Sequence, residues 1–273
     1  MFDLNRLLHA MSFRAGVATD FQRMLDWKLL RGSHEFPGPD GGTCINEAAI
    51  VAAGYPYRAV YCVKDLPAAF SRPISMLALC LNDTLEDELR QELLMPFVTR
   101  LGGSADTSKV EMARAELILQ RTVADLLAPA LARAGYGELA ERCRSLTTPT
   151  ELVELARCLR NMQGNPQRNA QSSALYQSLI SALEHAADAG RQWLAGLPTE
   201  VVVCAFSAMR EIAALDGDRF ADKVYRRAAA ILDTALAIGR QADDAETEVV
   251  AARMDAAKRA PEAAYRDGTL IAA

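Results

Sequence analysis

The segment 33–44 carries the residue types in this chain that most readily take part in chemistry. His34 and Cys44 stand ten residues apart, separated by a dense run of proline, glycine and aspartate. If that run folds back sharply, the imidazole reaches the thiol, and the pair supplies a base and a nucleophile. Glu35 or Asp40 would then orient the imidazole or carry a charge of its own. We therefore identify these four side chains as candidate catalytic residues.

The position of Cys44 favours a reactive thiol. Thr43 is predicted to cap a helix over residues 44–53, with Gly54 just past its end. Cys44 would then lie in the first turn, where free backbone N–H groups and the helix dipole favour negative charge. We expect this placement to lower the pKa of the thiol, which makes it a better nucleophile or metal ligand at neutral pH.

Three interpretations of this loop remain open. The first is a rigid connection, in which Cys44 is a small buried residue and His34 lies at the surface. The second is a cysteine–histidine catalytic site. The third is an anion or metal site formed by the glycine-rich turn before the helix. Gly41, Gly42 and Thr43 are then the candidate ligand-binding residues, and possible ligands of an ion are His34, Glu35, Asp40 and Cys44. The spacing fits no GxxxxGK phosphate loop and no common zinc motif, so we assign no metal ligand.

A second stretch of the chain carries further candidates. A helix is predicted to open at Arg72 and to end near Asn82 and Asp83. In the plainer interpretation, these last residues close that helix and cap the next one. In the functional alternative, Arg72 or Asp83 projects into a ligand site with His34.

Two resemblances involve the same part of the chain. Seven positions resemble the nucleophile helix of transglutaminase-like cysteine enzymes: Gly42, Cys44, Ala48, Gly54, Pro56, Arg58 and Val60. That resemblance implies a nucleophilic Cys44, although the family's later histidine on a strand has no counterpart here except His185. The run GSHEFPGPDGGTCINEAAIVAAGYPYRAV, with FSRPI, residues 81–83 and residues 93–103, is similar to a group of uncharacterised bacterial proteins. This likeness covers about the first third of the chain and implies that the segment behaves as a unit, without bringing an activity, substrate or cofactor.

The elements that must position these residues are predicted to be mainly α-helices in a bundle-like arrangement. Apolar residues recur at helical spacing in six later segments: 107–134, 137–146, 149–162, 172–194, 198–215 and 218–239. Pro129 should kink or end the first of them. The best candidate strand is 57–63, where β-branched and aromatic residues cluster, and one short strand cannot form a sheet.

A polar stretch with glycine and proline, 161–169, indicates a boundary within the chain. It separates a predicted N-terminal helical domain (1–163) from an alanine-rich helical segment (170–257). The N-terminal domain carries the loop at residues 33–44, which we call the motif loop. The domain and the segment can also pack as one body. We expect a first helix near residues 1–16 and a loosely ordered tail at 258–273.

Composition limits the classes of function. Of the 273 residues, 51% are apolar and 24% are charged, as in an ordinary globular protein. The formal net charge of −5 gives no electrostatic reason to bind nucleic acid or an anionic membrane. No apolar stretch approaches the ~20 residues of a membrane span. The six cysteines form no Cys-x-x-Cys pair, so we expect reduced thiols in a soluble, cytoplasmic protein.

Two hypotheses about function follow. The first is a small-molecule or peptide site at residues 33–44, which becomes a cysteine-dependent enzyme if Cys44 is reactive. The second is a non-enzymatic interaction or assembly protein, a homo-oligomer or the partner of another protein, that works through its C-terminal amphipathic helices. The sequence identifies no cofactor.

Overall fold

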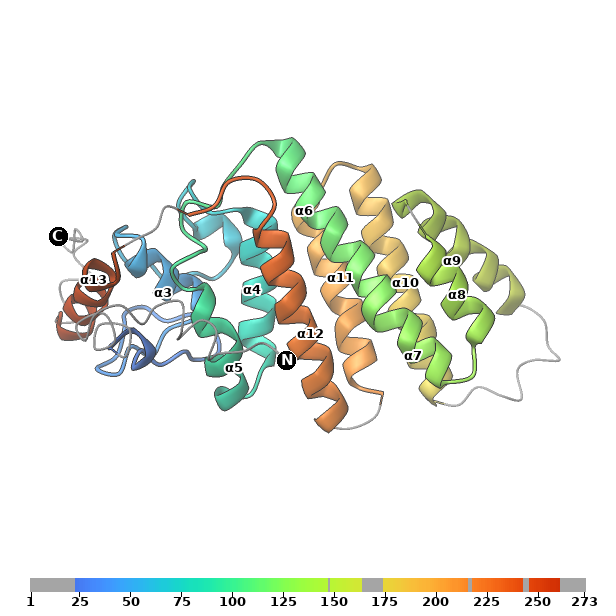
Figure 1. The fold of residues 1–273 in the computed structure, drawn as a ribbon, viewed down its shortest axis with the longest axis horizontal. Coiled ribbons are helices and arrows are strands. Elements are labelled where there is room, and N and C mark those ends of the chain that lie inside the picture. Colours follow the sequence, from blue (N-terminus) through green and yellow to red (C-terminus); the bar gives the residue numbers. More distant parts are fainter. Residues whose placement is uncertain (1–22, 147, 164–173, 216–217, 243–245, 261–273) are drawn as a thin grey trace. The chain divides into compact units, whose positions relative to one another are not determined.

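The computed structural model describes residues 23–146, 148–163, 174–215, 218–242 and 246–260. Within these ranges the protein is mainly α-helical and contains no strand, which confirms the predicted fold class (Figure 1). The candidate strand at 57–63 is an extended stretch that runs into a 3-10 turn at Val63–Asp65. It does not become a strand because no described segment pairs with its backbone.

Contacts along the chain divide the protein into two compact units, each assembled from separate stretches. Unit 1 contains Met1–Phe70, Asn82–Ser104 and Ala242–Ala273, whereas unit 2 contains Ser71–Leu81 and Ala105–Gln241. The sequence does not predict this division, because it depends on contacts between stretches that lie far apart along the chain.

The polar stretch that suggests a domain boundary instead connects two neighbouring helices. α9 (Pro149–Gln163) and α10 (Ala174–Leu194) both belong to unit 2 and pack against each other. Glycine, proline and polar residues mark where a helix stops, but they do not determine whether the next helix packs on it. The structure therefore divides the chain differently from the predicted domains 1–163 and 170–257.

Unit 2 is a set of long helices packed around an apolar core. In chain order they are the first part of α4 (Arg72–Thr84), α6 (Ser108–Arg121), a π-helical segment (Thr122–Leu127), α7 (Ala128–Arg133), α8 (Gly137–Ser145), α9, α10, α11 (Pro198–Ala213) and α12 (Asp218–Leu236). α10 packs along α11, and α6 contacts both α11 and α12 (Figure 1). On α11 the fully buried residues Val201, Ala205, Ala208 and Ile212 recur at helical spacing, as the apolar periodicity predicts.

The long helical segment of unit 2 continues through Pro129 without a break. The segment begins at α6, where the side chain of Thr107 caps the helix by accepting a hydrogen bond from Val110 N (3.4 Å). The π-helical segment follows α6 and directly precedes the helix that contains the proline. A π-turn widens the helix by one residue, which displaces the backbone groups that a proline ring would otherwise disrupt. The predicted stop at Pro129 therefore does not occur, and the helix widens locally before the proline.

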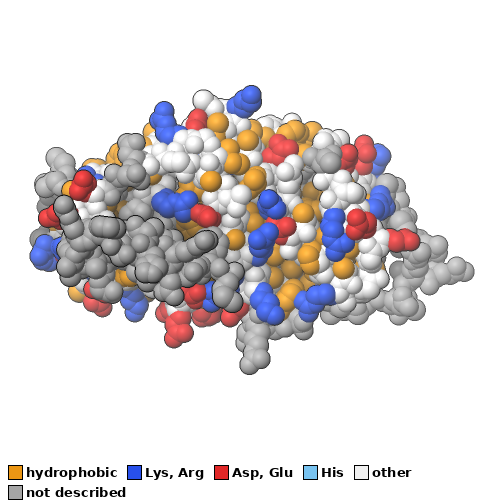
Figure 2. Space-filling view, viewed as in Figure 1, with side chains coloured by type: hydrophobic (Ala, Val, Ile, Leu, Met, Phe, Trp, Pro, Cys, Tyr) orange, Lys and Arg blue, Asp and Glu red, His pale blue; other side chains and the backbone are white. Residues whose placement is uncertain are grey.

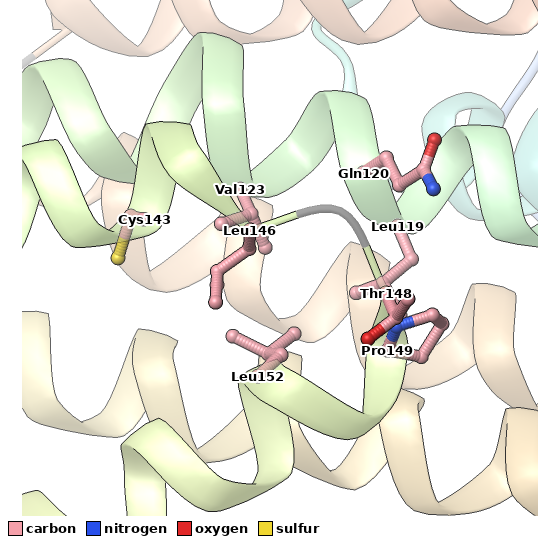
Figure 3. Close-up of a pocket in the computed structure, with 8 residues that line it drawn as sticks. All are labelled: Leu119, Gln120, Val123, Cys143, Leu146, Thr148, Pro149 and Leu152. Atoms are coloured by element: carbon pink, nitrogen blue, oxygen red, sulfur yellow. The ribbon is translucent and has the colours of Figure 1, made fainter.

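A small cavity lies beside this widened turn. Leu119, Val123, Leu146 and Leu152 point toward it, with Thr148 at its edge (Figure 3). Its volume of about 20 Å³ is enough for about one water molecule, which is too small for an organic ligand.

Unit 1 consists of shorter helices joined by irregular stretches. They are α3 (Ile45–Ala52), the end of α4 (Arg72–Thr84), α5 (Asp87–Leu94), a 3-10 turn (Met95–Phe97) and α13 (Thr247–Arg259). All eight residues of α3 are buried, including two polar ones, so their polar groups need partners inside the protein. Among the described residues, no helix combines the length and hydrophobicity that a bilayer span requires.

The C-terminal helix α13 packs on α3 within unit 1. Arg253 Nη1 donates to the carbonyl of Ala52 at the end of α3 (3.0 Å). A β-carbon at Gly54 would lie 2.7 Å from the Arg253 guanidinium carbon, and Gly54 has φ 79°, so glycine is required there. The tail predicted at 258–273 therefore starts inside a helix, and its residues 261–273, like the predicted first helix, lie outside the described residues.

Candidate functional site

The proline–glycine run of the motif loop makes a tight turn that rests on Trp27. Gly41 N donates to the carbonyl of Gly38 (2.9 Å), and Gly41 has φ 94°. A β-carbon on Gly41 would lie 2.7 Å from the indole ring, so the turn needs glycine for both its conformation and its contact. Trp27 is fully buried, and its Nε1 donates to Thr43 Oγ1 (2.9 Å).

Backbone hydrogen bonds fix the end of the loop beside residues 28–30. Lys28 N donates to the Asp40 carbonyl (2.7 Å), and Leu30 N donates to the Thr43 carbonyl (2.8 Å). Gly42, with φ 56°, lies between these two acceptors. The Thr43 hydroxyl accepts from the Trp27 indole, and the Thr43 backbone takes part in the hydrogen bonds to residues 28–30. Thr43 therefore does not cap α3 as the sequence suggests.

Cys44 is the N-cap of α3, and its side chain is completely buried. Its Sγ accepts a hydrogen bond from Glu47 N (3.4 Å). Burial raises the pKa of the thiol well above its ordinary value, and the negative charge of Glu47 raises it further. This is the opposite of the expected lowering, because a helix N-terminus favours a thiolate only where the charge is not sealed away from solvent beside a carboxylate. Cys44 therefore serves as a cap in this structure and is not placed as a nucleophile.

The side chain that organises the loop is Glu47, which is absent from the candidates identified in the sequence. Its carboxylate is completely buried. Oε1 accepts hydrogen bonds from Ser33 Oγ, His34 N and Val60 N, each at 2.9 Å. Oε2 accepts one from Cys44 N, also at 2.9 Å. One carboxylate thus joins the loop, the start of α3 and the extended stretch that follows the helix.

His34 is held by the same carboxylate. Its Nδ1 lies 3.2 Å from Glu47 Oε2, and because a carboxylate only accepts, Nδ1 is the donor. In the neutral form of the ring the lone pair is then on Nε2, which has no hydrogen-bond partner among the described residues. The His34 side chain is 23% exposed, and Tyr57 Oη donates to its carbonyl (2.8 Å). The imidazole is therefore anchored on one side and accessible to solvent.

The remaining acidic candidates of the loop do not orient this imidazole. Glu35 and Asp40 are exposed, and Nδ1 bonds to Glu47 instead. Asp40 contributes only its backbone carbonyl, which accepts the bond from Lys28 N described above. Arg72 begins α4 and belongs to unit 2, so the site described here does not include it.

Asp83 does reach the loop, together with its neighbour Asn82. Asp83 Oδ1 accepts from Gly32 N (3.0 Å). Asn82 Nδ2 donates to the Leu30 carbonyl (2.9 Å), and its Oδ1 accepts from Ile45 N (3.1 Å). These bonds satisfy backbone groups on both sides of the motif loop, so the pair supports the loop's shape.

A sequence signal for Glu47 does exist. The cap residue Cys44 and the glutamate three positions later form a reciprocal capping box, in which each side chain accepts from the other's backbone N–H. The pattern is usually recognised from serine or threonine at the cap, and cysteine in that place makes it inconspicuous.

Comparisons with protein-family models, with characterised proteins and with solved structures found no match for this chain. Among the described residues, no group of three or more histidine, cysteine or acidic side chains is arranged to hold a metal ion. The interpretation of the site therefore depends on its own geometry, in which a partly exposed imidazole is backed by a buried carboxylate.

Proposed function

We propose that the protein binds a small molecule or peptide at the motif loop, and that His34 acts there as the reactive base. The observation that carries this proposal is the pairing of His34 Nδ1 with the buried Glu47 carboxylate, with Nε2 left unpartnered among the described residues. A carboxylate in this position fixes the tautomer and orientation of an imidazole, so that its other nitrogen can accept or transfer a proton.

The other bonds to Glu47 support this role. Four further donors hold its two oxygens, so the carboxylate does not have to move when the imidazole binds a proton. The positive charge that His34 gains on accepting a proton would lie next to an acceptor with a fixed position, which is the condition for electrostatic stabilisation without reorganisation. The burial of Cys44 favours this imidazole-based site over the cysteine-dependent one.

An activated ester, p-nitrophenyl acetate, tests whether Nε2 is reactive. In the expected reaction Nε2 takes a proton from a water molecule as the water oxygen attacks the ester carbonyl. The carbonyl–oxygen bond to the leaving group then breaks, p-nitrophenolate and acetic acid leave, and the ring returns its proton to solvent. We expect His34→Ala to lower the rate of p-nitrophenolate release by about tenfold or more. His185→Ala, which removes a partly exposed histidine on α10, is the matched control and should leave the rate unchanged.

Cys44→Ser separates the two kinds of chemistry, because serine keeps a capping side chain but removes the thiol. An imidazole-based site retains its ester hydrolysis in this variant, whereas a cysteine-dependent site loses it. If His34→Ala hydrolyses the ester as fast as the unaltered protein, the proposed role of His34 is wrong.

A further inference from the structure

Unit 2 carries an open groove between the start of α6 and the turn that joins α10 to α11. The start of α6 and this turn lie at the same end of these helices (Figure 1). Its volume is about 560 Å³. The side chains that line it include Lys109, Met112, Ala113, Glu116, Trp193 and Leu194. Leu194 is 55% exposed, and Leu197 in the adjoining turn is 46% exposed. Large apolar side chains that gather at an open groove mark a surface that binds a partner.

The α6 side of the groove has opposite charges at its two ends. Lys109, Met112 and Glu116 lie on one face of the helix because they are three, four and seven residues apart. Lys109 and Glu116 are separated by two turns, about 10 Å along the axis. Among the described residues Lys109 has no ion-pair partner, and Glu116 accepts a single hydrogen bond, from Gln120 Nε2 (3.1 Å). The face is therefore positive at one end, apolar in the middle and negative at the other end.

We infer that this groove is the interface of a homodimer, and that its occupant is the same groove on a second copy of the chain. A two-fold axis that crosses α6 near Met112 lays this helix antiparallel on the α6 of the second copy. Lys109 of each copy then faces Glu116 of the other, so that the dimer contains two such pairs. A face with opposite charges at its ends is complementary to itself under a two-fold rotation.

The apolar side chains fit the centre of the same interface. Between or beside the two charges lie the apolar side chains of Met112, Trp193 and Leu194. The two-fold rotation brings these side chains against the same side chains of the second copy. Tryptophan and methionine are enriched in the buried centres of interfaces, whereas charged pairs at the rim set register and specificity. Hydrophobic side chains are also exposed among charged ones over the long helices in the view of Figure 2. Those are dispersed among charges, whereas the groove combines an apolar centre with a charge pattern that fits itself.

Sedimentation velocity of the full chain over a wide range of protein concentration tests this inference. We expect a reversible monomer–dimer equilibrium. Leu194→Asp should abolish the dimer, because it places two charges in the apolar centre of the interface. Leu194 is an exposed side chain at the end of α10, so this change leaves the core of unit 2 intact, which circular dichroism and the thermal midpoint can verify.

A charge-reversal series tests the register. Lys109→Glu alone, or Glu116→Lys alone, turns two attractive pairs into two repulsive ones, and we expect each to weaken the dimer by about tenfold. The double variant restores both pairs in the opposite orientation and should recover the original affinity. Lys223→Glu and Glu211→Lys, on parts of unit 2 that do not line the groove, are the matched controls and should have no effect.

Three outcomes would overturn the inference. One is a monomer at every concentration. The second is a dimer that Leu194→Asp leaves intact. The third is a double charge reversal that stays as weak as either single one, since this would show that Lys109 and Glu116 do not face each other across the two-fold axis.

Discussion

Unit 1 and unit 2 are stabilised in different ways. In unit 2, long helices satisfy their own backbone groups, and apolar side chains such as those on α11 fill the space between them. In unit 1, much of the backbone is irregular, and buried polar side chains supply the missing hydrogen-bond partners. Glu47 serves four backbone or side-chain donors besides the His34 imidazole, and Asn82 serves a carbonyl and an N–H group.

The same pattern recurs elsewhere in unit 1. Gln91 accepts from Leu29 N (2.9 Å) and donates to the Trp27 carbonyl (2.7 Å), while the buried Arg90 donates to the Asn82 carbonyl (2.7 Å). In unit 2 a comparable side chain, Arg114, binds the carbonyls of Ile238 and Arg240 beyond the end of α12. The difference teaches that an irregular loop can be fixed in one conformation like a helix. This requires single polar side chains that each form several of the hydrogen bonds that backbone groups provide within a helix.

The largest effect that this comparison predicts is that of Glu47→Ala in unit 1. The change leaves several buried N–H groups without acceptors, so we expect the free energy of unfolding to fall by about 4 kcal/mol. Urea unfolding followed by Trp27 fluorescence in a Trp193→Phe background reports on unit 1. Glu211→Ala on α11, a glutamate outside any such cluster, is the control. A loss below about 1 kcal/mol for Glu47→Ala would show that unit 1 does not depend on buried polar side chains that bind several backbone groups.

A deletion in the apolar core of unit 2 should follow in size. Ile212 is completely buried, and we expect Ile212→Ala to lower the free energy of unfolding by about 3 kcal/mol, through lost burial and the cavity left behind. Fluorescence of Trp193 in a Trp27→Phe background reports on unit 2. A loss as small as that of a surface change, below about 0.5 kcal/mol, would contradict the view that apolar packing stabilises this unit.

Two glycines with positive φ compare the units directly. Gly41 in unit 1 has φ 94° and contacts Trp27, whereas Gly135 in unit 2 has φ 87°, and a β-carbon added there would have no other atom within 4 Å. We expect Gly135→Ala to lower the free energy of unfolding by about 1 kcal/mol from backbone strain, and Gly41→Ala by about 2 kcal/mol because the steric clash adds to it. Equal losses, measured by the same two fluorescence signals, would mean that the Trp27 contact constrains the loop very little.

The smallest predicted effect concerns alkaline pH, and each unit contains a buried thiol that tests it. Burial raises the pKa of Cys143 to about 12 and that of Cys44 well above its ordinary value. A raised folded-state pKa means that stability is complete below the unfolded pKa, near 9, and is lost as pH rises from there towards the folded value. At pH 10 we expect each thiol to reduce the free energy of unfolding by about 1 kcal/mol relative to neutral pH. Cys44→Ser and Cys143→Ala should each remove part of this alkaline loss. If the free energy of unfolding of both variants depends on pH as it does in the unaltered protein, the raised pKa values of the two thiols are not its cause.

The helices of unit 2 could be predicted from the sequence because their apolar residues follow the period of the helix. The π-helical segment before Pro129 was the exception, since a one-residue widening of the backbone leaves no trace in residue type. The position of the tight turn at Gly41 was likewise predictable from its proline and glycine residues. The chemistry of the site was not, because the donors that surround Glu47 are mostly backbone N–H groups, which every residue except proline has.

The burial of Cys44 could not be predicted either. The helix-start argument concerns only local backbone, whereas the pKa of the thiol depends on what covers it from distant parts of the chain. In the same way, the imidazole could be identified as a candidate from its type, but its partner could be identified only from the fold, because nothing in the order of Glu35, Asp40 and Glu47 indicates which carboxylate turns towards the ring.

The contribution of α13 to unit 1 has a consequence for synthesis on the ribosome. Every stretch of unit 2 has been translated by residue 241, whereas unit 1 lacks Arg253 and the rest of α13 until residues 247–259 follow. Unit 1 is therefore completed after unit 2, although unit 1 also contains stretches that precede most of unit 2 in the chain. Until then the Ala52 carbonyl lacks its Arg253 donor and the buried residues of α13 are not in place, so we expect nascent chains to be open to chaperones and proteases during this interval.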